Sequence, residues 1–101
     1  MREAFIYDGL RTPFGRHAGA LAAIRPDDLL SAVIQAVVER SPFRQDQYED
    51  VIVGCTNQAG EDCRNIARRA GLMAGLPVDV AGMTVNRLCA SGLAAVLDAS
   101  R

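Results

Sequence analysis

The fold of this chain is decided chiefly by residues 83–99, which read MTVNRLCASGLAAVLDA. Thr84, Val85 and Leu88 favour extended structure, so we expect a short strand at the start of this stretch. Residues 90–99 are rich in Ala and Leu and carry one charge, Asp98, which favours a buried helix. The stretch therefore predicts a strand, a tight corner and a helix, with Cys89 in the corner.

Cys89 is a candidate nucleophile because of this position. The start of a helix presents unpaired N–H groups and the positive end of the helix dipole, and both stabilise a thiolate and a developing oxyanion. Ala90, Ser91 and Gly92 are small and leave room for a substrate carbonyl in front of the sulfur. The corner would be the thiol counterpart of a nucleophile elbow. The alternative interpretation is a small, inert core cysteine.

The composition is that of an ordinary globular domain. The chain has 101 residues, 50% of them hydrophobic and 23% charged, with a formal net charge of -1. This length allows one domain with a core. The near-neutral charge offers no basic field for nucleic acid or anionic lipid. Because no apolar run suits a signal peptide or a membrane span, we expect a cytoplasmic protein without nucleic-acid or membrane partners.

The sequence lacks the residue patterns of a disulfide framework, a metal site or a nucleotide-binding loop. The three cysteines, Cys55, Cys63 and Cys89, are odd in number and lack the spacing of a disulfide framework or a zinc site. Cys55 closes an apolar run and is interpreted as a core residue. Cys63 lies in a polar loop and is interpreted as a bystander thiol or, second, as a ligand contact. His17, the only histidine, is interpreted as a solvated loop residue rather than a general base.

Strands and helices are expected to alternate along the chain. Apolar or β-branched runs predict three strands, at residues 4–7, 51–55 and roughly 82–86. A first helix is expected to start near Pro26 and to end at Ser41-Pro42, and a second to be capped by Asn65. The order implies an α/β fold with three parallel strands joined by right-handed crossovers.

The inner face of the second helix is predicted from its apolar spacing. That face is expected to hold Ile66, Ala67, Ala70 and Met73, with Arg68 and Arg69 outside. The last helix is still mostly apolar where the sequence ends at Arg101. An apolar helix needs a cover, so we expect the 101 residues to be part of a longer design.

Polar residues follow two of the predicted strands. The loop after residues 51–55 carries Asn57, Gln58, Glu61, Asp62 and Arg64. It is interpreted as a solvated loop or as the border of a site or subunit contact, because ligands bind at the carboxyl ends of parallel strands. Asn86 and Arg87 either hold the corner by hydrogen bonds or contact a substrate.

Three stretches of the chain resemble the thiolases, the acyl-CoA:acetyl-CoA acyltransferases. Residues 85–93, VNRLCASGL, resemble the nucleophile motif of that family, and residues 11–15, RTPFG, agree with it. Residues 57–68, NQAGEDCRNIAR, are most similar to the 3-oxoadipyl-CoA thiolases of aromatic-compound breakdown. The resemblance runs over the whole chain and implies a partial thiolase-like fold, with residues 1–101 as an incomplete N-terminal domain.

The resemblance implies thiolytic cleavage of a 3-oxoacyl-CoA, possible in reverse as a Claisen condensation. Cys89 would attack the 3-oxo carbon, acetyl-CoA would leave, and coenzyme A would collect the acyl group from the sulfur. The Cys89 N–H would help to hold the oxyanion. Coenzyme A is a co-substrate in this reaction, no cofactor is bound covalently, and the family is homo-oligomeric, as dimers or tetramers.

The family's activating His and its second Cys have no counterpart in this chain, and His17 matches neither. We therefore expect the isolated chain to lack turnover and, because its first strand would have an open apolar edge, to be poorly soluble or partly disordered. Two alternatives stay open beside a thiolase. One is a non-catalytic, thiolase-like remnant that packs against other subunits. The other is a 3-oxoacyl synthase-like enzyme, which also places a Cys at such a corner.

Overall fold

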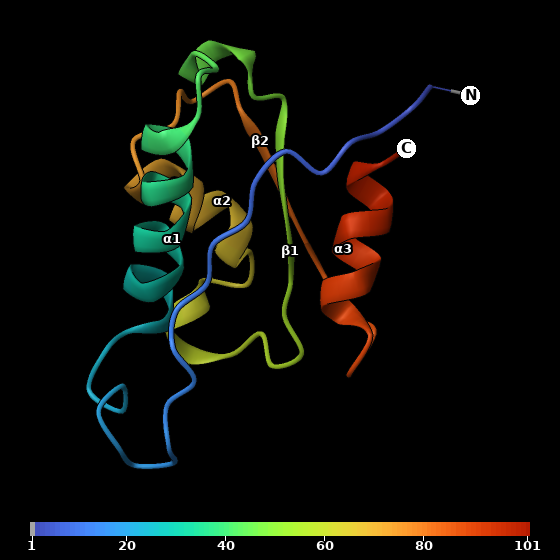
Figure 1. The fold of residues 1–101 in the computed structure, drawn as a ribbon. Coiled ribbons are helices and arrows are strands. Elements are labelled where there is room, and N and C mark those ends of the chain that lie inside the picture. Colours follow the sequence, from blue (N-terminus) through green and yellow to red (C-terminus); the bar gives the residue numbers. More distant parts are fainter. Residues whose placement is uncertain (1) are drawn as a thin grey trace.

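The computed structural model of the protein describes residues 2–101, apart from the side chain of Asp62. Two strands and three α-helices alternate along the chain (Figure 1), with short 3-10 turns at Gln45–Gln47 and Gly60–Asp62. The elements are α1 (Pro26–Arg40), β1 (Asp50–Gly54), α2 (Ile66–Met73), β2 (Ala81–Val85) and α3 (Ser91–Ala99).

The two strands form a parallel pair between two layers of helix. Asp50 is in register with Ala81, and Gly54 with Val85, so both strands end at the same edge. Helices α1 and α2 lie on one side of the pair and α3 on the other (Figure 1). The predicted α/β class with parallel strands is therefore confirmed.

The predicted first strand is wrong: residues 4–7 have no strand structure, and the described sheet holds two strands rather than three. Phe5 and Ile6 are 83% and 89% exposed. The segment is held by its end instead, where the ring of Tyr7 packs edge-on against Phe43 at 5.0 Å between centroids. A strand exists only through hydrogen bonds to a neighbour, and no described strand pairs with this segment.

Helix α1 begins and ends, and helix α2 begins, as their sequence signals predict. Pro26 is the first residue of α1, and the helix closes at Ser41. The side chain of Asn65 caps α2 and accepts a hydrogen bond of 3.3 Å from the Arg68 N–H. The same carboxamide donates to the Gly82 carbonyl at 3.0 Å, which ties the start of α2 to β2.

The prediction for the two faces of α2 is correct for Ile66, Ala67 and Ala70 and wrong for Met73 and the two arginines. Ile66, Ala67 and Ala70 are buried, but Met73 is 42% exposed. Neither arginine points simply into solvent. Arg68 donates to the carbonyls of Val78 and Val80, at 2.9 and 2.5 Å, and Arg69 reaches Asp27 of α1. Long guanidinium side chains can fold back onto such acceptors, which helical spacing does not reveal.

Asp27 is the centre of the contact between α1 and α2. Its side chain is fully buried and accepts from Arg25 at 3.1 Å and from Arg69 at 2.6 Å. Hydrogen bonds from these two guanidinium groups hold the pKa of the Asp27 carboxyl well below its usual range. The residue therefore does more than complement the helix dipole: it is a buried ionic bridge between helices.

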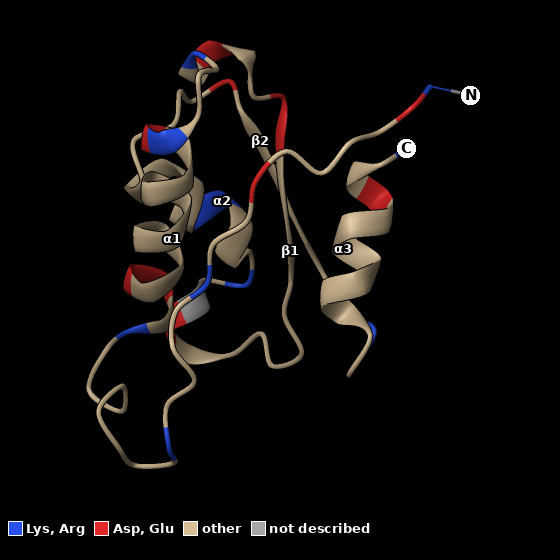
Figure 2. Cartoon of the chain, viewed as in Figure 1, with Lys and Arg blue, Asp and Glu red and all other residues tan. Residues whose placement is uncertain are grey.

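The hydrophobic core is made mainly of small side chains, which lets the layers approach closely. Ala67 and Ala70 of α2 are buried on one side of the strands, and Ala94 and Ala95 of α3 on the other. Figure 2 shows that the strands and α3 carry little charge, while charged residues gather around α1, α2 and their loops. No helix within residues 2–101 combines the length and hydrophobicity needed to cross a bilayer.

We predict that Gly54→Ala destabilises the fold. A Cβ at Gly54 would lie 2.4 Å from the carbonyl carbon and oxygen of Ser91, and backbone atoms cannot move aside cheaply. The expected loss is about 1–3 kcal/mol of unfolding free energy, measured by urea denaturation. Gly92→Ala is the matched control, because a Cβ there meets no atom within 4 Å and should stabilise α3 by roughly 0.5–1 kcal/mol. Equal stability of the Gly54→Ala and original chains would contradict the prediction.

We also predict that Asp27→Asn lowers the thermal midpoint, whereas Asp28→Asn, one residue on and exposed, changes it little. Because the folded pKa of Asp27 is depressed, its stabilising effect is full above the ordinary carboxyl pKa of about 3.9 and is lost as the pH falls below that value. The difference in midpoint between the original chain and Asp27→Asn should therefore shrink on acidification below about pH 4. A difference independent of pH would contradict this origin.

Candidate functional site

Cys89 lies where the sequence predicts it, in the corner between β2 and α3. Strand β2 ends at Val85, residues 86–90 form the corner, and α3 begins at Ser91. The thiol is exposed, and none of the protein groups that the structure describes is hydrogen-bonded to it. The inert core interpretation of Cys89 is thus wrong as to burial. The residue is open to a reagent or substrate.

The helix behind Cys89 starts without a side-chain cap. Ala90 is the N-cap residue of α3, and its carbonyl accepts the first helical hydrogen bond, from the Ala94 N–H at 2.9 Å. The Ser91 N–H donates to the Leu88 carbonyl at 3.1 Å, but an alanine side chain cannot accept from the N–H groups that follow, so the positive end of the helix can meet a group approaching from outside. An anionic sulfur and an oxyanion are such groups.

Asn86 holds the corner with both ends of its carboxamide. Its Oδ1 accepts from the Leu88 N–H at 2.9 Å, and its Nδ2 donates to the Thr56 carbonyl at 3.3 Å. The interpretation of Asn86 as a corner-holding residue is therefore confirmed. Arg87 contributes through its backbone, since its N–H donates to the Ser91 Oγ at 2.8 Å and its carbonyl accepts from the Ala90 N–H.

Ser91 is the functional candidate that nothing in the sequence singled out beyond its small size. It is 3% exposed, although residues 86–90 are all exposed. Besides accepting from Arg87, its hydroxyl donates to the Leu88 carbonyl at 2.6 Å. Leu88 has a φ of 51°, in the left-handed region that L-residues with branched side chains seldom adopt. The prediction that Leu88 favours extended structure is therefore wrong, because hydrogen bonds with Asn86 and Ser91 hold a conformation that the residue type does not indicate.

The loop after β1 lies at the same sheet edge as the corner, as predicted. The Cys55 N–H extends the strand pairing by donating to the Val85 carbonyl at 2.9 Å, and Thr56 then contacts Asn86. Cys55 itself is half-buried rather than a core residue. Further along the loop, the Glu61 carboxylate lies 3.6 Å from the Arg25 guanidinium. Gln58, Gly60 and Cys63 help to line a surface hollow. The side chain of Asp62, part of the predicted polar cluster, is outside the described residues.

Cys63 is exposed, as predicted, but its sulfur has a partner. The Arg69 guanidinium donates to the Cys63 Sγ at 3.3 Å, and Cys63 itself has a left-handed φ of 53°. Arg69 thus contacts both Cys63 and the buried Asp27. His17 is exposed in the turns before α1, consistent with a solvated residue. Among the described residues, no group of three or more His, Cys, Asp or Glu side chains could hold a metal ion.

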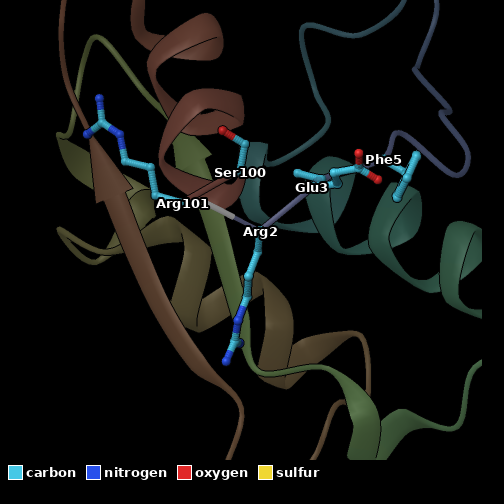
Figure 3. A pocket seen from close by; sticks show the side chains of 6 residues that line it. Arg2, Glu3, Phe5, Ser100 and Arg101 are labelled. Atoms are coloured by element: carbon cyan, nitrogen blue, oxygen red, sulfur yellow. The ribbon is translucent and has the colours of Figure 1, made fainter.

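A surface hollow near the two chain ends is not a candidate site. It measures about 980 Å³ and is lined by Arg2, Glu3, Ala4, Phe5, Ser100 and Arg101. In Figure 3 the Arg2 and Arg101 side chains point in different directions, and neither points toward Glu3. Ser100 follows the last turn of α3, the end of the helix opposite Cys89. A site needs convergent polar groups, and this hollow has none.

The whole chain matches known proteins of one family. The family model described as "Thiolase, N-terminal domain" matches residues 4–101. The beta-ketoadipyl-CoA thiolase of Acinetobacter baylyi is 56% identical over 102 aligned residues, which cover 100% of this chain and 25% of that protein. The 3-oxoadipyl-CoA/3-oxo-5,6-dehydrosuberyl-CoA thiolase of Escherichia coli is 55% identical with the same coverage.

Two solved structures superpose on the fold of this chain. Human mitochondrial 3-ketoacyl-CoA thiolase in complex with CoA superposes with a TM-score of 0.81 at 31% identity, over 89% of this chain and 23% of that one. An acetyl-CoA acetyltransferase from Syntrophomonas wolfei superposes with a TM-score of 0.77 at 34% identity, over 89% of this chain and 22% of that one. The chain spans about a quarter of the length of the relatives that it matches.

We predict that iodoacetamide at neutral pH alkylates Cys89 faster than Cys55 in the folded chain. Cys89 is exposed at an uncapped helix start, whereas Cys55 is half-buried. We expect Cys89 to react about tenfold faster than Cys55, with rates read from peptide masses over time. The urea-unfolded chain is the control, since its three thiols should react alike. Equal rates in the folded chain would count against an activated thiol at Cys89.

Proposed function

This chain belongs to the thiolase family, and from that premise we propose that it carries the nucleophile, Cys89, of an enzyme that cleaves 3-oxoacyl-CoA with coenzyme A. The observation that carries the proposal is the exposed, unpartnered Cys89 thiol in front of the uncapped first turn of α3. Residues 1–101 would contribute part of the N-terminal domain of such an enzyme.

The proposed reaction has two covalent steps at Cys89. In the first, the Cys89 thiolate adds to the 3-oxo carbon, and the oxyanion that forms accepts a hydrogen bond from the Cys89 N–H. The bond between C2 and C3 then breaks, its electron pair stays on C2, and protonation of C2 releases acetyl-CoA. The acyl group remains on the Cys89 sulfur as a thioester, which preserves its reactivity.

In the second step the thiol of coenzyme A attacks this thioester. The acyl-CoA product leaves, and the Cys89 thiolate is restored. Each step needs a proton donor or acceptor, and within residues 2–101 no acidic or basic side chain is hydrogen-bonded to Cys89. We therefore assign the activating base and the C2 acid to groups outside this segment.

The favoured substrate is 3-oxoadipyl-CoA. The name of the Acinetobacter baylyi relative gives this acyl group, and that of the Escherichia coli relative gives it beside 3-oxo-5,6-dehydrosuberyl-CoA; both alignments span the whole chain, at 56% and 55% identity. The motif at residues 57–68 supports the same subgroup. The family match and the relatives' names also favour a thiolase over a 3-oxoacyl synthase.

Assembly into a homo-oligomer is part of the same proposal. Both strands of the described sheet are edge strands, and α3 exposes Leu93, Val96 and Leu97. Open strand edges and an uncovered apolar helix face are surfaces that a protein covers with further chain or with another subunit.

We predict that a chimeric thiolase that contains this chain is active. All 101 residues replace the aligned quarter of the Acinetobacter baylyi thiolase, and acetyl-CoA release from 3-oxoadipyl-CoA and coenzyme A is measured. The chimera should turn over, and Cys89→Ser should lower kcat by about 10⁴-fold or more. Mass spectrometry without coenzyme A should find the acyl group on the peptide that contains Cys89.

Cys63→Ser is the control for the loss of a thiol, and it should keep the activity of the chimera. An inactive but folded chimera would favour the non-catalytic alternative. A Cys89→Ser chimera as active as its parent would refute Cys89 as the nucleophile.

A further inference from the structure

Ser91 has an unusual position for a hydroxyl residue at this corner. Its side chain is shielded from water at 3% exposure, while the corner residues before it are exposed. A buried hydroxyl is unfavourable unless it is hydrogen-bonded, and here it both accepts and donates. The Arg87 N–H donates to Oγ at 2.8 Å, and the Ser91 O–H donates to the Leu88 carbonyl at 2.6 Å.

These two hydrogen bonds enclose Leu88, the residue that directly precedes Cys89. Leu88 adopts a φ of 51°, which is sterically unfavourable for a leucine and has to be maintained by its surroundings. The Asn86 Oδ1 also holds the Leu88 N–H, at 2.9 Å, but that contact is exposed and competes with water. The two bonds to Ser91 are partly buried and are therefore the more protected restraint.

The backbone of Ser91 packs against the end of β1. Gly54 faces Ser91 so closely that a Cβ on Gly54 would lie 2.4 Å from the Ser91 carbonyl carbon and oxygen. The sheet thus supports Ser91, and Ser91 supports the turn that carries the nucleophile. The backbone conformation of Leu88 determines the direction in which the next residue leaves the corner, so these contacts act on Cys89 through its backbone.

We propose that Ser91 is a positioning residue for Cys89: its hydroxyl holds Leu88 in the left-handed conformation that aims the sulfur at the substrate. The inference rests on the proposed function. Ser91 touches no reacting atom and acts only through the backbone on either side of Leu88. Misplacement of a nucleophile by about 1 Å can cost about 10²-fold in rate, which is the effect expected from losing this restraint.

The test uses the active chimera with Ser91→Ala and Ser91→Thr. Ser100→Ala is the matched control, because the Ser100 hydroxyl makes the same kind of bond, to the carbonyl three residues back, at the opposite end of α3 and in an exposed position. We expect Ser91→Ala to lower kcat per active site by about 10²-fold with KM nearly unchanged. We expect Ser91→Thr, which keeps Oγ, to recover most of the loss and Ser100→Ala to lose nothing.

Active sites are counted by the acyl-enzyme mass at Cys89, so that unfolded molecules do not enter kcat. The proposal is overturned if Ser91→Ala keeps its kcat per site, or if it loses only the number of active sites. It is also overturned if Ser91→Thr is as slow as Ser91→Ala, because the hydroxyl would then not be the cause. A parent chimera without Cys89-dependent turnover would instead refute the proposed function, which separates the two failures.

Discussion

The close approach of the β1 backbone to the first turn of α3 is the constraint on which the rest of this structure depends. Gly54 is the last residue of β1, and because it has no side chain the Ser91 carbonyl can lie 2.4 Å from the position that a Cβ would occupy. β1 and β2 end in register, and the first turn of α3, which follows the corner after β2, lies against the end of β1. The chain must reverse within residues 86–90, and Leu88 takes a left-handed conformation to do so. The exposure of Cys89 follows from that reversal.

The two faces of the sheet are joined to their helices by different physical means. On one face, α2 is attached through polar groups: Thr84 accepts from the Ala67 N–H at 3.1 Å and donates to the Asn65 Oδ1 at 2.8 Å. The buried Asp27 then links α2 to α1. On the other face, α3 packs with alanines and backbone against β1. Polar networks demand that every member be satisfied, whereas the α3 contact depends only on steric fit.

Much of this arrangement could be predicted from local signals. Pro26 and Asn65 mark helix starts in the structure as they do in the sequence, and the parallel strands follow from alternation of short apolar runs with helices. Failures occur where a residue's partner is distant in the sequence. Residues 4–7 have the composition of a strand but no described neighbour, and Arg69 has the spacing of an outward residue but an acidic partner 42 positions away. Composition and periodicity carry no information about such partners.

The sequence by itself determined the strand, corner and helix around Cys89, and also the resemblance to the thiolases, because local propensity and a contiguous motif are properties of neighbouring residues. Only the tertiary structure decided that Ser91 is buried and that Cys89 is exposed. It also decided that the Ser91 hydroxyl forms hydrogen bonds with the Arg87 N–H and the Leu88 carbonyl. The physical reason is the contact with Gly54, which lies 37 positions before Ser91 in the sequence and against it in space. The proposed nucleophile, Cys89, can be predicted from the motif, but its place beside the close contact of β1 with α3 is visible only in the tertiary structure.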